Sequence, residues 1–186
     1  YYKLFLSQGH SDPRILVNYG VICKQNGQNK KAIELYQRCI AEYPFYAQVY
    51  SNLGNLYREI QKIDEAKVLT LKAIELDPDR AESHSNIGEI YLLEEDFVEA
   101  EAAFKRAIEL KNDFYKPYCN LANLYLNQKK LPEAQQAIEK AIQLNPKFAE
   151  SYSLLSSIYF DKGQLNDAVI AILKAIKLKP NFFEAY

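Results

Sequence analysis

The strongest constraint on this chain is a short motif that returns every 34 residues. The motif begins as Asn52-Leu53-Gly54-Asn55-Leu56-Tyr57 and reappears over residues 86–91 and 120–125. A fixed period of this length indicates one supersecondary unit that is copied and stacked. Stacked units share one continuous core, so the chain is expected to fold as an array rather than as unrelated domains.

Each 34-residue copy contains two amphipathic stretches of about 14 residues, the spacing expected of two helices. In the second copy we expect the first helix over residues 47–60, where Leu53, Leu56 and Tyr57 lie on one face. We expect the second helix over residues 64–76. No segment alternates with a period of two, so the fold class is predicted to be all-α.

The period predicts a single solenoid over residues 1–186. Five full copies are expected at 13–46, 47–80, 81–114, 115–148 and 149–182. Residues 1–12 match the second helix of a preceding copy, and residues 183–186 match the start of a further one. Asp12 is the expected N-cap of the first full copy, with Pro13 in its first helical position. We expect the chain to be a fragment of a longer protein.

Small residues recur where two helix backbones are expected to meet. One column contains Gly20, Gly54, Gly88, Ala122 and Ser156, and another contains Ala32, Ala66, Ala100, Ala134 and Ala168. Gly27 and Gly163 are expected to end first helices in the left-handed conformation that glycine adopts most easily. Gln61, Glu95 and Lys129 occupy the equivalent positions, where strained turns are expected.

These columns resemble the tetratricopeptide repeat (TPR). The third copy carries the pattern best, with Ile87-Gly88, Tyr91, Ala100, Phe104 and Ala107. The resemblance covers residues 13–182 and implies a right-handed superhelix, whose concave face is lined by first helices and usually holds a peptide. The chain is similar to multi-repeat bacterial and cyanobacterial TPR proteins. It is similar also to the TPR region of O-linked N-acetylglucosamine transferases.

One polar column has no evident core role and is our candidate binding site. It contains Asn18, Asn52, Asn86 and Asn120, and the fifth copy replaces it with Leu154. A side-chain amide both donates and accepts hydrogen bonds, so aligned amides suit the backbone of an extended peptide. This column resembles the asparagine ladder of the transferase repeats. The alternative is that the amides bond to neighbouring helix backbone and serve only the fold.

Neighbouring positions extend the candidate site on the same inferred face. The full set of predicted peptide-binding residues is Asn18, Asn52, Asn55, Asn86, Glu89, Lys116, Asn120 and Asn123. Four apolar residues near the ends of first helices either form ligand pockets or pack between layers; they are Leu92, Leu93, Leu126 and Phe160.

A more specific alternative is the dicarboxylate clamp of chaperone-binding repeats, which grips a C-terminal carboxylate. The resemblance implies roles for Asn55, Asn86 and Lys116. However, Ser51 and Asn120 stand where that family has cations, and charge-assisted bonds carry such recognition.

Composition excludes several function classes. The chain has 23 Lys and Arg against 24 Asp and Glu, a balance that argues against nucleic-acid binding. No apolar run is long enough for membrane insertion. Three widely spaced cysteines, Cys23, Cys39 and Cys119, match neither a disulfide framework nor a zinc motif. They favour a reducing, cytoplasmic setting, in which Cys119 is either an inert or a reactive thiol.

The sequence therefore predicts a protein-interaction scaffold that binds an extended peptide or partner protein. We expect no enzyme activity of its own, no cofactor and no metal, because no phosphate loop, nucleophile elbow or ligand cluster is present. One alternative is a substrate-recruiting arm of a larger enzyme such as a glycosyltransferase. Another is a scaffold that forms homo-oligomers through its terminal repeats.

Overall fold

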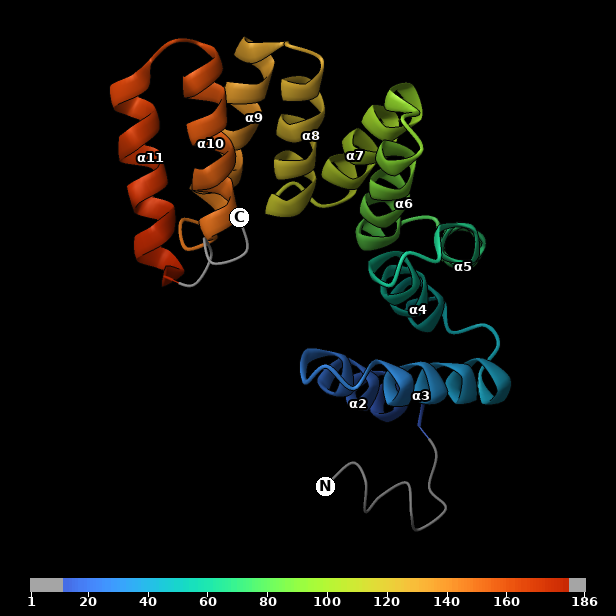
Figure 1. Ribbon diagram of the computed structural model, residues 1–186. Helices are drawn as coiled ribbons and strands as arrows, with labels where there is room; N and C mark the ends of the chain where they lie inside the picture. The colour runs from blue at the N-terminus through green and yellow to red at the C-terminus, as the bar shows by residue number, and fades with distance from the viewer. Residues whose placement is uncertain (1–11, 181–186) are drawn as a thin grey trace. The chain divides into compact units, whose positions relative to one another are not determined.

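The computed structural model describes residues 12–180, and within this range the chain forms ten α-helices and no strand (Figure 1). The helices are α2 (Pro13–Gln25), α3 (Asn29–Glu42), α4 (Ala47–Glu59), α5 (Ile63–Leu76), α6 (Ala81–Leu93), α7 (Phe97–Leu110), α8 (Tyr115–Asn127), α9 (Leu131–Leu144), α10 (Ala149–Asp161) and α11 (Leu165–Leu178). The all-α prediction is confirmed. The expectations for residues 1–11 and 183–186 lie outside the described residues.

The chain divides into two compact units, Tyr1–Ile90 and Tyr91–Tyr186. In each unit, consecutive helices form antiparallel pairs joined by short turns, such as α4 with α5 and α10 with α11 (Figure 1). The next first helix packs against both members of the preceding pair. In unit 1, α4 contacts α2 and α3; in unit 2, α10 contacts α8 and α9. Successive repeats therefore stack through the contact of one first helix with both helices of the preceding pair.

The small-residue columns lie where helix backbones approach most closely. Ala32, Ala66, Ala100 and Ala134 are completely buried. Gly54 is also buried, and a Cβ atom there would lie 2.6 Å from Thr70 Oγ1 and 3.1 Å from the backbone oxygen of Ala66. Only a residue without a side chain fits this crossing of α4 and α5.

The turns between paired helices adopt the left-handed conformation predicted for them. Gly27 and Gly163 have φ values of 72° and 74°, and Gln61, Glu95 and Lys129 have values of 63°, 61° and 57°. Residues with a Cβ are strained in this region by about 1–2 kcal/mol. These residues keep the left-handed conformation despite its strain, because backbone hydrogen bonds close each turn. One such bond runs from Lys62 N to Tyr57 O at 2.8 Å.

An aromatic column closes the turn between successive repeats. The hydroxyl of Tyr50 donates to Pro44 O at 2.9 Å, and Tyr118 and Tyr152 make equivalent bonds to the carbonyls six residues before them. In the same column, His84 Nε2 lies 2.8 Å from Pro78 O. Because a carbonyl only accepts, Nε2 carries the proton. His84 therefore replaces tyrosine as a turn-closing donor.

The start of α2 confirms the predicted cap. The Asp12 side chain accepts from Arg14 N at 2.8 Å, and Pro13 occupies the first helical turn. Hydrogen bonding from the Arg14 guanidinium lowers the pKa of Asp12 to about 2. The carboxylate is consequently ionised wherever the helix is folded near neutral pH, which favours its role at the positive end of the helix.

Candidate functional site

Within each unit the asparagine column lies on the first helices of the pairs, and we call the side of these helices that carries it the first-helix face of that unit. In unit 1 this face carries Asn18 on α2, Asn52 on α4 and Asn86 on α6. Asn18 is exposed and Asn52 is half-buried. Neither amide has a hydrogen-bond partner among residues 12–180. Two aligned amides in unit 1 therefore have both donor and acceptor groups open to a ligand.

Asn86 is held differently, because its amide bonds to the preceding repeat. Asn86 Nδ2 donates to Ser51 O at 3.3 Å and lies 3.1 Å from Ser51 Oγ. The residue equivalent to Ser51 in the preceding repeat is Val17, which has no hydroxyl to hold Asn52 in the same way. The carbonyl of Ser51 can only accept, so the Asn86 amide nitrogen must point towards it. Asn86 therefore fits the alternative in which the amides bond to neighbouring helix backbone and serve the fold. Its Oδ1 can still accept a hydrogen bond.

A chain of polar contacts crosses the first-helix face of unit 1 beside the asparagines. Lys24 Nζ lies 2.7 Å from Glu59 Oε1, and Asn55 Nδ2 donates to the same oxygen at 3.3 Å. Arg58 Nη2 donates to Asn55 Oδ1 at 2.9 Å and lies 2.7 Å from Glu89 Oε2. These opposite charges neutralise one another, so this face presents no strong cationic or anionic field. Sequence reasoning placed Asn55 and Glu89 here but missed Arg58, the residue that joins them.

In unit 2 the predicted residues are placed less uniformly. Lys116 and Asn123 on α8 are exposed, whereas Asn120 is half-buried and already engaged in an interaction. Cys119 Sγ lies 3.2 Å from Ser151 Oγ on α10, and burial raises the pKa of the Cys119 thiol. The thiol is therefore kept neutral, which favours the interpretation of this cysteine as inert.

The four apolar residues at the ends of the first helices divide into two groups. Leu92 and Leu126 are half-buried and pack against the core of unit 2. Leu93 and Phe160 remain 54% and 65% exposed. Leu92 and Leu126 therefore stabilise the packing between helix layers, whereas Leu93 and Phe160 are available to a ligand.

Metal-ligand clusters and membrane-spanning helices are both absent among residues 12–180. This range holds no cluster of three His, Cys, Asp or Glu side chains that suits a metal ion. None of its helices is both long and apolar enough to cross a bilayer.

Known proteins resemble the chain in both sequence and fold. A 62-residue stretch is 40% identical to the UDP-N-acetylglucosamine–peptide N-acetylglucosaminyltransferase of Giardia intestinalis, covering 33% of this chain and 4% of that enzyme. The structure of TTC0263, a TPR protein of Thermus thermophilus, matches with a TM-score of 0.82 and 16% identity, covering 93% of this chain and 94% of that one.

A second solved structure is that of YrrB, described as a TPR protein with an unusual peptide-binding site. It matches with a TM-score of 0.63 and 19% identity, covering 99% of this chain and 95% of its own. The TPR resemblance is thus confirmed, and the fold is one that generally serves protein interaction. The family model that describes the C-terminal domain of cilia and flagella-associated protein 70 matches residues 2–186, and the chain belongs to that family of TPR domains.

Proposed function

We propose that the chain is an interaction scaffold whose first-helix face binds an extended segment of a partner protein. The observation that carries this proposal is the pair of aligned amides of Asn18 and Asn52 on adjacent helices α2 and α4, which have no hydrogen-bond partner among residues 12–180. Asparagine is a mediocre helix former, so its recurrence at a fixed helix position favours a role outside helix stability.

Simple geometry supports an extended ligand. Packed helices lie about 8–10 Å apart, and an extended chain advances about 3.3 Å per residue. Successive first helices therefore meet such a chain about every third residue. One amide per helix then pairs with peptide backbone, which requires no particular side-chain sequence. Asn86, with its nitrogen bonded to Ser51, offers Oδ1 to a backbone N–H of the ligand.

The charge network determines how this binding responds to salt. Because Lys24, Arg58, Glu59 and Glu89 are already paired with one another, the ligand gains little from long-range attraction. Affinity should therefore depend weakly on ionic strength.

The proposal is tested with peptides selected against the wild-type chain from a random display library. The double variant Asn18→Ala/Asn52→Ala should lose binding to most selected peptides at an unchanged thermal midpoint. Asn86→Ala should lower stability by about 0.5–1.5 kcal/mol, because it removes a hydrogen bond between repeats. Asn166→Ala, at an exposed position on α11, is the matched control. Peptides that bind the double variant as tightly as the wild type would refute the role of these amides.

The match to the Giardia transferase favours one alternative. Our chain would then be a substrate-recruiting arm, and the same face would present protein substrates to a catalytic domain. The match covers only 4% of that enzyme, so this alternative rests on the repeats alone. The full-length reading frame separates the two proposals, since a transferase domain on the same polypeptide would favour the arm.

We also propose a reducing compartment such as the cytoplasm. Cys23, Cys39 and Cys119 are all unpaired, and the first two are buried. Fractionation of cells that express the full-length protein tests this directly.

A further inference from the structure

A groove of about 450 Å³ opens between the second helices α3 and α5 of unit 1, both of which pack on α4. Its lining includes Ile40 of α3, Leu53 and Tyr57 of α4, and Asp64, Glu65 and Val68 of α5. All of these residues lie in unit 1. None of the asparagines of the first-helix face lines the groove, so it is a separate surface.

Val68 makes this groove more apolar than the repeat requires. The matching groove of unit 2 is lined by Leu121, Tyr125, Glu133 and Gln136, each 68 residues after its counterpart in unit 1. Glutamine therefore suffices at the Val68 position, although the leucine and tyrosine of the two grooves are the same. Val68 is 68% exposed, so its apolar side chain is available to a ligand.

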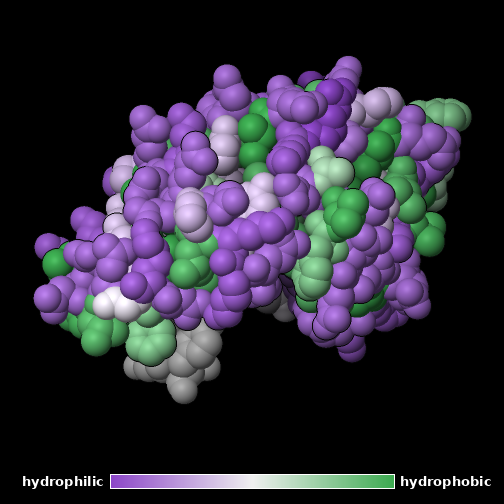
Figure 2. All heavy atoms as spheres, turned by 90° about the horizontal axis from the view of Figure 1, so that it is seen from above, coloured by the Kyte–Doolittle hydropathy of each residue, from purple (hydrophilic) through white to green (hydrophobic). Residues whose placement is uncertain are grey.

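The surface around such apolar residues is polar. On the face that Figure 2 shows, hydrophobic residues form small groups among hydrophilic ones. A wide apolar patch marks a large interface, whereas a small apolar group can hold one or two side chains of a ligand. The polar residues beside the groove then determine which ligand fits.

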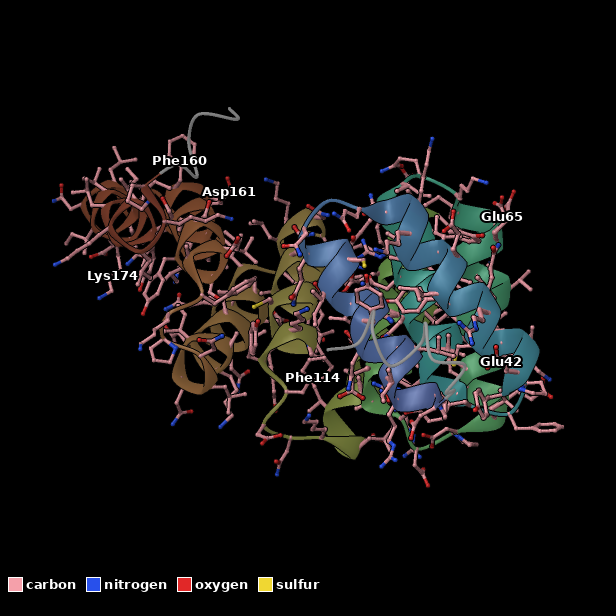
Figure 3. The ribbon with its side chains drawn as sticks, turned by 90° about the horizontal axis from the view of Figure 1, so that it is seen from below. Glu42, Glu65, Phe114, Phe160, Asp161 and Lys174 are labelled. Atoms are coloured by element: carbon pink, nitrogen blue, oxygen red, sulfur yellow. The ribbon has the colours of Figure 1, made fainter. Side chains whose placement is uncertain are left out.

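The charged residues that line the groove are both acidic. Asp64 and Glu65 lie in the first turn of α5, and Figure 3 labels Glu65 where it projects from this helix at the edge of the view. The Asp64 carboxylate has no ion pair or hydrogen bond within residues 12–180. Glu65 Oε1 lies 3.5 Å from Lys62 Nζ, but both side chains are about half exposed, and such a pair contributes little. One ammonium group against two carboxylates leaves this end of the groove negative, which favours a basic ligand.

The spacing of the apolar and acidic residues suits an extended chain. Asp64 and Val68 are four residues apart on α5, or about 6 Å along the helix axis. Side chains two positions apart in an extended segment point to the same side and lie about 6.6 Å apart. One such segment can therefore place an apolar side chain beside Val68 and a basic side chain beside Asp64.

We propose that the groove between α3 and α5 binds an extended segment of a partner protein, with an apolar side chain on Tyr57 and Val68 and a lysine or arginine on Asp64 and Glu65. Charge-assisted hydrogen bonds from the basic side chain to the carboxylates fix the direction of the segment. This site goes beyond the first-helix face, because it recognises side chains rather than peptide backbone. Loss of one site need not affect the other.

The test is a nuclear magnetic resonance titration of the whole isotope-labelled chain, which measures weak binding. The probe is a synthetic peptide with leucine and arginine two positions apart in a glycine–serine background. Wild type should bind it saturably. Val68→Gln introduces the residue that unit 2 carries, so the fold should persist, and affinity should fall about fivefold or more because an apolar contact is lost. Val98→Gln, the same change at a 78% exposed position on α7, should bind normally.

The second arm tests the charge of the ligand. Glutamine in place of the arginine of the peptide should weaken binding to wild type about two- to fivefold, and glutamate should weaken it further. In Asp64→Asn/Glu65→Gln, the arginine and glutamine peptides should bind equally. A general loss of folding would weaken both peptides and would not remove the difference between them.

Several outcomes would overturn the proposal. These are no saturable binding by wild type, equal binding by wild type and Val68→Gln, or a glutamate peptide that binds as tightly as the arginine peptide. Loss of binding in Asn18→Ala/Asn52→Ala would assign the peptide to the first-helix face instead. Self-association of wild type that Val68→Gln abolishes would make the occupant a second copy of the chain, which also refutes the proposal.

Discussion

Replacing Gly54 with alanine tests the packing logic of the repeat most directly. In an exposed helix this change stabilises by about 1 kcal/mol, because alanine has the higher helix propensity. In α4 the added Cβ atom would lie 2.6 Å from Thr70 Oγ1, about 1 Å closer than a normal contact. Thr70 is completely buried, and its hydroxyl donates to Ala66 O at 2.8 Å, so it cannot rotate away without losing that bond.

The magnitude follows from these opposing effects. Overpacking of a filled core costs about 1–3 kcal/mol, and a contact this short belongs in the upper half of that range. After the gain in helix propensity, we expect Gly54→Ala to destabilise by about 1–2 kcal/mol. For a chain of this length, that lowers the thermal midpoint by about 2–8 °C. Urea unfolding followed by circular dichroism measures the free energy directly.

A double-mutant cycle with Thr70→Ala isolates the clash. Thr70→Ala alone should destabilise, because it leaves a small cavity in a buried site. In that background the methyl group of Gly54→Ala enters the vacated space, so the second change should be nearly neutral. The expected coupling is about 1–2 kcal/mol. If Gly54→Ala stabilises the wild-type chain, as it would in an exposed helix, the close-approach argument is wrong.

Three further predictions concern the core, the turns and a buried thiol. Ala100→Leu should destabilise by about 1–3 kcal/mol, because Ala100 is completely buried beside Phe104; an unchanged thermal midpoint would contradict this. Gln61→Gly should stabilise by up to about 1 kcal/mol in urea unfolding, since glycine relieves the left-handed strain at φ 63° but loses more chain entropy. Burial raises the pKa of the Cys39 thiol from 9.0 to about 11, so folded Cys39 should resist a thiol-specific disulfide reagent near neutral pH. Because the folded pKa is the higher one, the associated stability should be present below about pH 9 and decline as the pH rises towards 11.

The 34-residue period by itself determines most of the fold. Two helices per copy, the small columns at Gly54 and Ala100, and the left-handed turns at Gly27 and Gln61 all follow from residue type and spacing. Each copy repeats the same residue spacing, so a helix or column that is unclear in one copy can be assigned from the others. The sequence also placed the asparagines on the first helices, although their binding role stays a prediction.

Only the tertiary structure distinguished residues that share a column. Asn52 and Asn86 are equivalent in sequence, yet Asn86 bonds to Ser51 of the preceding repeat while Asn52 has no partner among residues 12–180. The difference arises from a residue 35 positions away, Ser51 against Val17, which no local pattern reveals. Likewise, only packing showed which apolar residues remain exposed on α11. Repetition determines where a side chain sits on its helix, and contacts between helices determine whether that side chain is left for a ligand.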